Sequence, residues 1–179
     1  SLIDKKEYDA TYITVESEHS ALSAVIGAAS TGVRTFTASA SHGLALMHEV
    51  TGVASASRLP VVMAVVSRAI PGPMCLWCDH SDIMTQRDQG WIQLFAESPQ
   101  EGLDFTMIAY RTSEDERVLT PTMVDIDGFY CSHLTEPVDV PTEDEAERFI
   151  SEFRPVNAQL NTDMPYAIDN LSSPAIFTE

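Results

Sequence analysis

Residues 61–66, Val-Val-Met-Ala-Val-Val, form the apolar run that most narrowly limits how this chain can fold. A strand with one face in water alternates apolar and polar residues, whereas this run contains no polar residue. It is therefore typical of a strand covered on both faces, as in a parallel sheet between helices. Pro60 separates it from residues 44–57, which carry apolar side chains at helical spacing. The pattern predicts a buried strand that follows a helix.

Similar signals on both sides of this run alternate between strand and helix. β-Branched and aromatic residues predict further buried strands over residues 12–15, 34–39 and 122–126. Small or periodic apolar residues, with Ser98-Pro99 as a start signal, predict helices over residues 21–29, 44–57, 98–110 and 142–153. This alternation predicts an α/β fold, with a mostly parallel sheet and helices on both of its faces.

Length and charge exclude several classes of protein. The 179 residues suffice for one α/β domain with a substantial core. The formal net charge is −17, which argues against a nucleic-acid partner because phosphate neutralisation needs clustered Lys and Arg side chains. No apolar run approaches the roughly 20 residues that span a bilayer, and no signal segment opens the chain. We therefore expect a cytoplasmic protein without a membrane partner.

The carboxyl-terminal part of the chain has a different composition. From His133 onward the sequence holds ten acidic residues and two basic ones. Pro137 and Pro141 favour an extended connection, and the residues beyond Arg154 show no periodicity. We expect a domain over residues 1–140 and an acidic connector or wrapping arm over residues 141–179.

Polar residues 16–19, Glu-Ser-Glu-His, stand between the predicted strand 12–15 and the predicted helix 21–29. Ligand sites of open α/β sheets lie at the carboxyl ends of strands, and a carboxylate gains stability near a helix N-terminus. Glu18 is therefore a candidate functional carboxylate. Ser17 with an acidic residue close behind it could equally serve only as a helix cap.

Arg68 follows the buried run and opens a loop rich in Pro and Gly, over residues 67–82. A guanidinium at the end of a buried strand can bind a planar carboxylate with two hydrogen bonds. The alternative is that Arg68 forms an ion pair with a neighbouring acid, such as Asp79 or Asp82, and only steadies the loop.

The same loop carries Cys75 and Cys78, at the spacing of redox pairs and of half a zinc site. Cys131 is the only other cysteine, so the chain cannot build a four-thiolate iron–sulfur site. We interpret the three thiols as reduced and structural. His80 and its acidic neighbours more often form a hydrogen-bonded cap, so we expect no metal site.

Several segments together resemble the α subunit of pyruvate:ferredoxin oxidoreductases and related 2-oxoacid:ferredoxin oxidoreductases. They include Val-Glu-Ser-Glu-His-Ser-Ala from Val15, Arg-Leu-Pro-Val-Val-Met-Ala-Val-Val-Ser-Arg-Ala from Arg58, Trp-Cys-Asp-His-Ser-Asp from Trp77 and Gln-Arg-Asp-Gln-Gly-Trp from Gln86. The likeness covers roughly residues 12–140. It implies a domain of the type that holds the aminopyrimidine end of thiamine diphosphate.

The resemblance also assigns roles. Glu18 matches the Glu that contacts the pyrimidine ring, which makes it the expected cofactor-binding and catalytic residue, and Arg68 matches the Arg that contacts the substrate carboxylate. The implied reaction is oxidative decarboxylation of a 2-oxoacid, with pyruvate as the expected substrate. Its products would be acyl-coenzyme A and CO₂, with electrons passing through iron–sulfur clusters on other subunits to ferredoxin.

Two departures from the family pattern bear on assembly. Family members begin with a further strand and a substrate loop, which this sequence lacks, and they continue into a second α/β domain. The chain also has no Gly-Asp-Gly pattern followed by Asn, so the resemblance implies a partner subunit that binds the diphosphate and magnesium. Two alternatives remain: a non-catalytic assembly subunit that keeps the fold, and half of another thiamine diphosphate enzyme.

Overall fold

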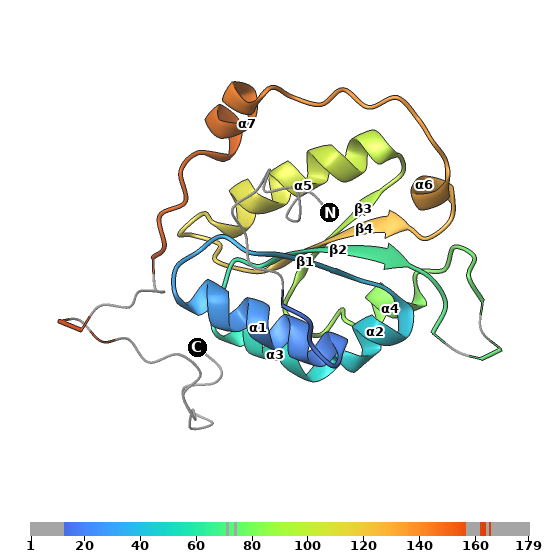
Figure 1. Cartoon of the computed structure of the whole chain (residues 1–179), viewed down its shortest axis with the longest axis horizontal. Coiled ribbons are helices and arrows are strands. Elements are labelled where there is room, and N and C mark those ends of the chain that lie inside the picture. The colour runs from blue at the N-terminus through green and yellow to red at the C-terminus, as the bar shows by residue number, and fades with distance from the viewer. Residues whose placement is uncertain (1–12, 71, 74, 157–161, 164, 166–179) are drawn as a thin grey trace.

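The computed structural model describes residues 13–70, 72–73, 75–156, 162–163 and 165. One sheet lies between two layers of helices (Figure 1). The strands are β1 (Phe36–Ser39), β2 (Val62–Ser67), β3 (Ile92–Ala96) and β4 (Thr122–Asp127). The helices are α1 (Glu18–Ser30), α2 (Ser41–Leu46), α3 (His48–Ala56), α4 (Ser81–Met84), α5 (Pro99–Ser113), α6 (Tyr130–His133) and α7 (Glu143–Ile150).

All four strands run parallel, in the order β1-β2-β4-β3. The apolar run forms β2, next to β4 in the middle of the sheet, where burial on both faces explains its lack of polar residues. Helices α1 to α4 lie on one side of the sheet and α5 on the other, with α7 beyond α5 (Figure 1). The predicted parallel sheet with helices on both faces is confirmed.

Alternate residues of the central strands belong to two separate cores. Towards α1 to α4, Met63, Val65 and Met123 pack with helix residues that include Leu22, Leu44, Ala54 and Ile83. Towards α5, Val62 and Val124 pack around Ala109. Because the strands are parallel, the carboxyl ends of β1, β2 and β4 lie at one edge of the sheet.

The predicted helix start at Ser98-Pro99 is confirmed, because the Ser98 hydroxyl accepts a hydrogen bond from the Glu101 backbone N–H and Pro99 is the first residue of α5. The acidic helix begins with a capping box, in which the Thr142 and Glu145 side chains bond each other's backbone N–H groups.

Three expectations from sequence need correction. Residues 13–15 form no strand, and Ile13 is 74% exposed, because no sheet strand lies beside them; Tyr12 is outside the described residues. The single helix expected over 44–57 is two helices, α2 and α3, which meet at Met47. Strand β3 was not predicted, since it is a half-buried edge strand without a continuous apolar run.

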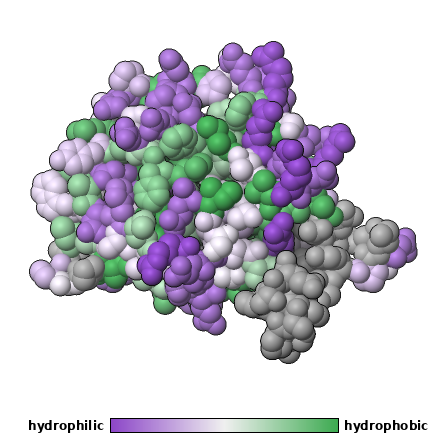
Figure 2. All heavy atoms as spheres, turned by 180° about the vertical axis from the view of Figure 1, so that it is seen from behind, coloured by the Kyte–Doolittle hydropathy of each residue, from purple (hydrophilic) through white to green (hydrophobic). Residues whose placement is uncertain are grey.

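No helix among the described residues is long and apolar enough to cross a bilayer. Apolar side chains nevertheless reach the surface, where Figure 2 shows them gathered in the middle of one face with hydrophilic side chains around them. Among the exposed apolar residues are Phe36 on edge strand β1 and Phe95 on edge strand β3.

Candidate functional site

Strands β1, β2 and β4 bring polar side chains to the same edge of the sheet. The register pairs Ser39 with Val65 and Val65 with Asp125, so these three side chains lie on one face, the face towards α1 to α4. Ser67, two residues after Val65, extends the same row. The N-terminus of α1, with Glu18, reaches this row from the side of β1.

Two nearby carboxylates at the start of α1 differ in their surroundings. The Glu16 carboxylate accepts a 2.6 Å hydrogen bond from the Ser20 hydroxyl, and this bond lowers the pKa of Glu16. Ser17 caps α1, because its hydroxyl accepts from the Ser20 backbone N–H. The Glu18 carboxylate has no hydrogen-bond or ion-pair partner among the described residues, although it stands at the positive end of the helix. Glu18 is thus the carboxylate left available for a ligand.

Glu18 fits closely against the first turn of α2. A Cβ atom on Gly43 would stand 2.9 Å from Glu18 Cγ, 3.0 Å from Glu18 Oε1 and 2.8 Å from Ser39 Oγ. Real Cβ atoms almost never come so near, so glycine at this position is what allows the Glu18 side chain to lie there. The bare Gly43 backbone and the Ser39 hydroxyl form one wall beside the carboxylate. We call this wall of Gly43 and Ser39 the Glu18 seat.

Arg68 is the first residue after β2 and is half-buried. Its guanidinium makes no hydrogen bond or ion pair with any residue that the structure describes. The two acids proposed as its ion-pair partners are otherwise engaged. Asp79 accepts the Ser81 backbone N–H at 2.6 Å, and Asp82 accepts the backbone N–H of Arg68 at 3.1 Å and not its guanidinium. The geometry therefore favours a guanidinium that is available to a ligand.

A His–Asp pair lies at the same edge. Asp125 is 1% exposed, and its carboxylate accepts a hydrogen bond from the Ser67 hydroxyl and pairs with His80 Nδ1 at 2.7 Å. Burial raises the pKa of Asp125. The His80 ring stands edge-on to Phe95, at the carboxyl end of β3. Sequence reasoning missed Asp125, although an Asp within the apolar run 122–126 was a signal for it.

The three thiols form no disulfide, and the surroundings of two of them favour the protonated form. Cys75, Cys78 and Cys131 are all free. Desolvation, followed by the charge of Asp127, raises the pKa of both Cys78 and Cys131, which keeps these two thiols protonated. No group of three or more His, Cys, Asp or Glu side chains that could hold a metal ion occurs in the described part of the chain.

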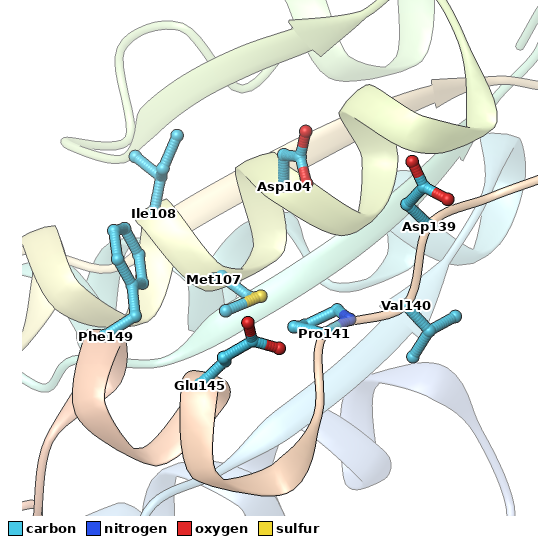
Figure 3. Close-up of a pocket in the computed structure, with 8 residues that line it drawn as sticks. All are labelled: Asp104, Met107, Ile108, Asp139, Val140, Pro141, Glu145 and Phe149. Carbon is cyan, nitrogen blue, oxygen red and sulfur yellow. The ribbon is translucent and has the colours of Figure 1, made fainter.

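A groove of about 540 Å³ lies elsewhere, on the α5 side of the sheet (Figure 3). Met107 and Ile108 of α5 and Phe149 of α7 supply apolar walls, and Asp104, Asp139 and Glu145 add carboxylates. It shares no residue with the polar row at the carboxyl edge, so we do not assign the chemistry to it.

The sequence matches the protein family described as "Pyruvate flavodoxin/ferredoxin oxidoreductase, thiamine diP-bdg" over residues 1–179. The chain belongs to this family. It is 50% identical over 173 residues to the pyruvate synthase subunit PorA of Pyrococcus abyssi, a match that covers 97% of the chain and 44% of that protein. The PorA subunit of Thermotoga maritima is 52% identical over 153 residues, 86% of the chain and 39% of that protein.

Relatives in this family have names that refer to different 2-oxoacids. The ketoisovalerate oxidoreductase subunit VorA of Pyrococcus furiosus is 42% identical over 173 residues, 97% of the chain and 43% of that protein. The 2-oxoglutarate:ferredoxin oxidoreductase of Magnetococcus marinus, solved with 2-oxoglutarate, coenzyme A and succinyl-CoA, aligns with a TM-score of 0.60 at 25% identity. That alignment covers 71% of this chain and 23% of the other. The chain spans less than half the length of these curated relatives.

Proposed function

We propose that this chain forms the part of a 2-oxoacid:ferredoxin oxidoreductase that holds the aminopyrimidine end of thiamine diphosphate. The reaction would be oxidative decarboxylation of a 2-oxoacid, with pyruvate as the first candidate, to acyl-coenzyme A and CO₂, with electrons passed to ferredoxin. The observation that carries the proposal is Glu18, a carboxylate without a partner among the described residues, at a helix N-terminus beside the Glu18 seat.

The residues fit the aminopyrimidine group chemically. An unpaired carboxylate can bind a ring nitrogen, and a wall of glycine backbone lets a flat ring approach closely. Thiamine diphosphate, when bound, supplies a thiazolium carbon able to attack the 2-oxo carbon. Glu18 would hold the ring through a hydrogen bond to its nitrogen and would share a proton with that nitrogen.

Arg68 would bind the substrate. A guanidinium can hold a carboxylate with two parallel hydrogen bonds, and its half-buried root at the end of β2 limits its movement. Holding the carboxylate would orient the 2-oxo carbon before CO₂ leaves.

The remaining parts of the reaction would reside on partners. A complementary subunit would bind the diphosphate and magnesium, and other subunits would carry the iron–sulfur clusters. Exposed apolar side chains on both edge strands, such as Phe36 and Phe95, are suited to contacts with such subunits. A location in the cytoplasm is part of this proposal.

The test is Glu18→Gln in the assembled complex. Gln keeps the size of Glu but cannot share the proton, so turnover should fall by about a hundredfold or more, while assembly and folding persist. Glu16→Gln is the matched control, since its carboxylate already bonds Ser20, and its turnover should stay close to that of the unchanged complex. Near-normal turnover of Glu18→Gln would refute the catalytic role and favour an assembly subunit without catalysis.

Measurements of cofactor binding and of products distinguish the proposed reaction from that of another thiamine diphosphate enzyme. The complex should bind thiamine diphosphate whereas this chain alone should not, because the diphosphate site would be on the partner. Reduction of ferredoxin on addition of 2-oxoacid and coenzyme A distinguishes this reaction from that of another thiamine diphosphate enzyme, in which no iron–sulfur partner is needed.

A further inference from the structure

The most completely enclosed acidic side chain at the carboxyl edge is Asp82, which is 0% exposed. Its carboxylate accepts three backbone N–H groups. Oδ2 accepts from Ser41 at 2.7 Å and from Arg68 at 3.1 Å, and Oδ1 accepts from the adjacent Ile83 at 2.8 Å. Both oxygens are used as acceptors, so the position requires a carboxylate and not an amide.

The first of these contacts fixes the turn between β1 and α2. Ser41 is the first residue of α2 and has a positive φ of 49°, a conformation that is unfavourable for a residue other than glycine. Such a conformation persists where the surroundings hold it. Here the backbone N–H is held by Asp82, and the Ser41 hydroxyl donates to the Ala69 carbonyl at 2.7 Å.

The second contact fixes the end of β2. Asp82 holds the Arg68 backbone N–H, and Ser41 holds the carbonyl of Ala69, the residue that follows Arg68. Together with the Ser41–Asp82 bond, three hydrogen bonds thus connect the β1–α2 turn, the root of Arg68 and the start of α4 into one closed unit. Gly43, two residues beyond Ser41, is part of the Glu18 seat.

We propose that Asp82 is a positioning residue that sets the distance between the Glu18 seat and the Arg68 guanidinium. This inference rests on the proposed function, in which the first site holds the cofactor ring and the second holds the substrate carboxylate. Asp82 touches neither ligand. It acts through the backbone of Ser41 and Arg68, so that both sites move together when its hydrogen bonds are lost.

The test is Asp82→Asn in the complete subunit within its assembled complex. An amide offers one acceptor oxygen and places an NH₂ group against backbone N–H donors. We expect the KM for the 2-oxoacid to rise about tenfold, through Arg68, and kcat to fall by a similar factor, through Glu18, which corresponds to one or two lost hydrogen bonds. Asp79→Asn is the matched control: Asp79 is exposed and caps only the neighbouring turn, so both constants should stay within about twofold.

A double-substitution cycle with Arg68→Lys separates positioning from general stabilisation. If Asp82 acts through the Arg68 guanidinium, Asp82→Asn should raise the KM much less in the Arg68→Lys background than in the unchanged complex. A merely structural role predicts independent effects that multiply, and that result would overturn the inference.

A milder variant keeps the inference testable if Asp82→Asn does not assemble. Ser41→Ala removes the hydroxyl contacts with the Ala69 carbonyl and with His42 Nδ1, and it leaves the Asp82 contact with the Ser41 backbone in place. It should shift the KM and kcat in the same directions by a smaller factor, and unchanged constants would contradict the proposal.

If Arg68→Lys alone leaves the KM unaltered and Glu18→Gln retains turnover, the proposed function fails. If those two behave as expected while Asp82→Asn does not, only the role of Asp82 fails.

Discussion

Glu18 lies so close to Gly43 that a Cβ atom on Gly43 would overlap the Glu18 side chain. That atom would stand 2.9 Å from Glu18 Cγ and 2.8 Å from the Ser39 hydroxyl oxygen. Gly43 has an ordinary helical backbone, without a positive φ, so space and not conformation requires glycine here.

Gly43→Ala should therefore displace the Glu18 side chain without unfolding the protein, since that side chain is exposed and can move. We expect turnover of the complex to fall by about tenfold or more, as with other small displacements of reacting groups. The control is Gly27→Ala in the middle of α1, where an added Cβ meets nothing within 4 Å. This control should stabilise the helix by up to about 1 kcal/mol and leave turnover unchanged. Normal turnover of Gly43→Ala would contradict the claim that the position of Glu18 beside Gly43 matters for the reaction.

Arg68→Lys tests the substrate role. Lys keeps the positive charge but loses the planar pair of donors, so the KM for the 2-oxoacid should rise roughly ten- to a hundredfold, which matches about 1.5–3 kcal/mol for a charge-assisted hydrogen bond. Thiamine diphosphate binding and thermal stability should hardly change. Arg87→Lys is the control, because Arg87 is exposed and its guanidinium contacts the adjacent Asp88 carboxylate and the Met84 carbonyl. A loss of stability with an unaltered KM would assign Arg68 a structural role instead.

The thiols give a prediction about metal content. The double variant Cys75→Ser/Cys78→Ser should keep the fold and the activity of the complex, because neither thiol bonds a partner covalently and the pKa of Cys78 is raised. Elemental analysis of the isolated chain should find neither zinc nor iron at one equivalent. Stoichiometric zinc that disappears in the double variant would show that the cysteines bind metal.

Asp125 gives a prediction about pH. Burial raises its pKa above the ordinary value of 3.8, so the folded chain binds this proton more tightly than the unfolded chain does. Its contribution to stability is therefore greatest at low pH and is lost as the pH rises from 3.8 through the folded pKa. Asp125→Asn lacks this titration, so its free energy of unfolding, relative to the unchanged protein, should increase over that range.

Urea unfolding at a series of pH values measures this difference. Asp115→Asn is the control: hydrogen bonds from Arg117 lower the pKa of Asp115, so its effect on stability is lost only as the pH falls through and below 3.8, and the relative stability of this variant should be flat above about pH 5. A flat difference for Asp125→Asn over the same range would contradict a raised pKa.

Much of the local structure could be read from the sequence. The apolar run of β2, the start of α5 at Ser98-Pro99 and the cap of α1 at Ser17 depend on neighbouring residues, and short-range patterns record such preferences. Strand β3 and the break at Met47 were missed. An edge strand exists because it pairs with β4, and a helix of apolar residues bends where its packing changes, so neither is visible in a local pattern.

For the candidate site, the sequence by itself determined which residues could take part: Glu18 at the start of a helix and Arg68 after a buried strand. Only the tertiary structure decided which groups lie beside these two side chains. It placed Gly43 beside Glu18, and it directed Asp82 to backbone N–H groups and away from the Arg68 guanidinium. The reason is physical: whether a side chain is available depends on contacts between segments tens of residues apart, such as Ser41 and Asp82, and these contacts exist only once the sheet has assembled.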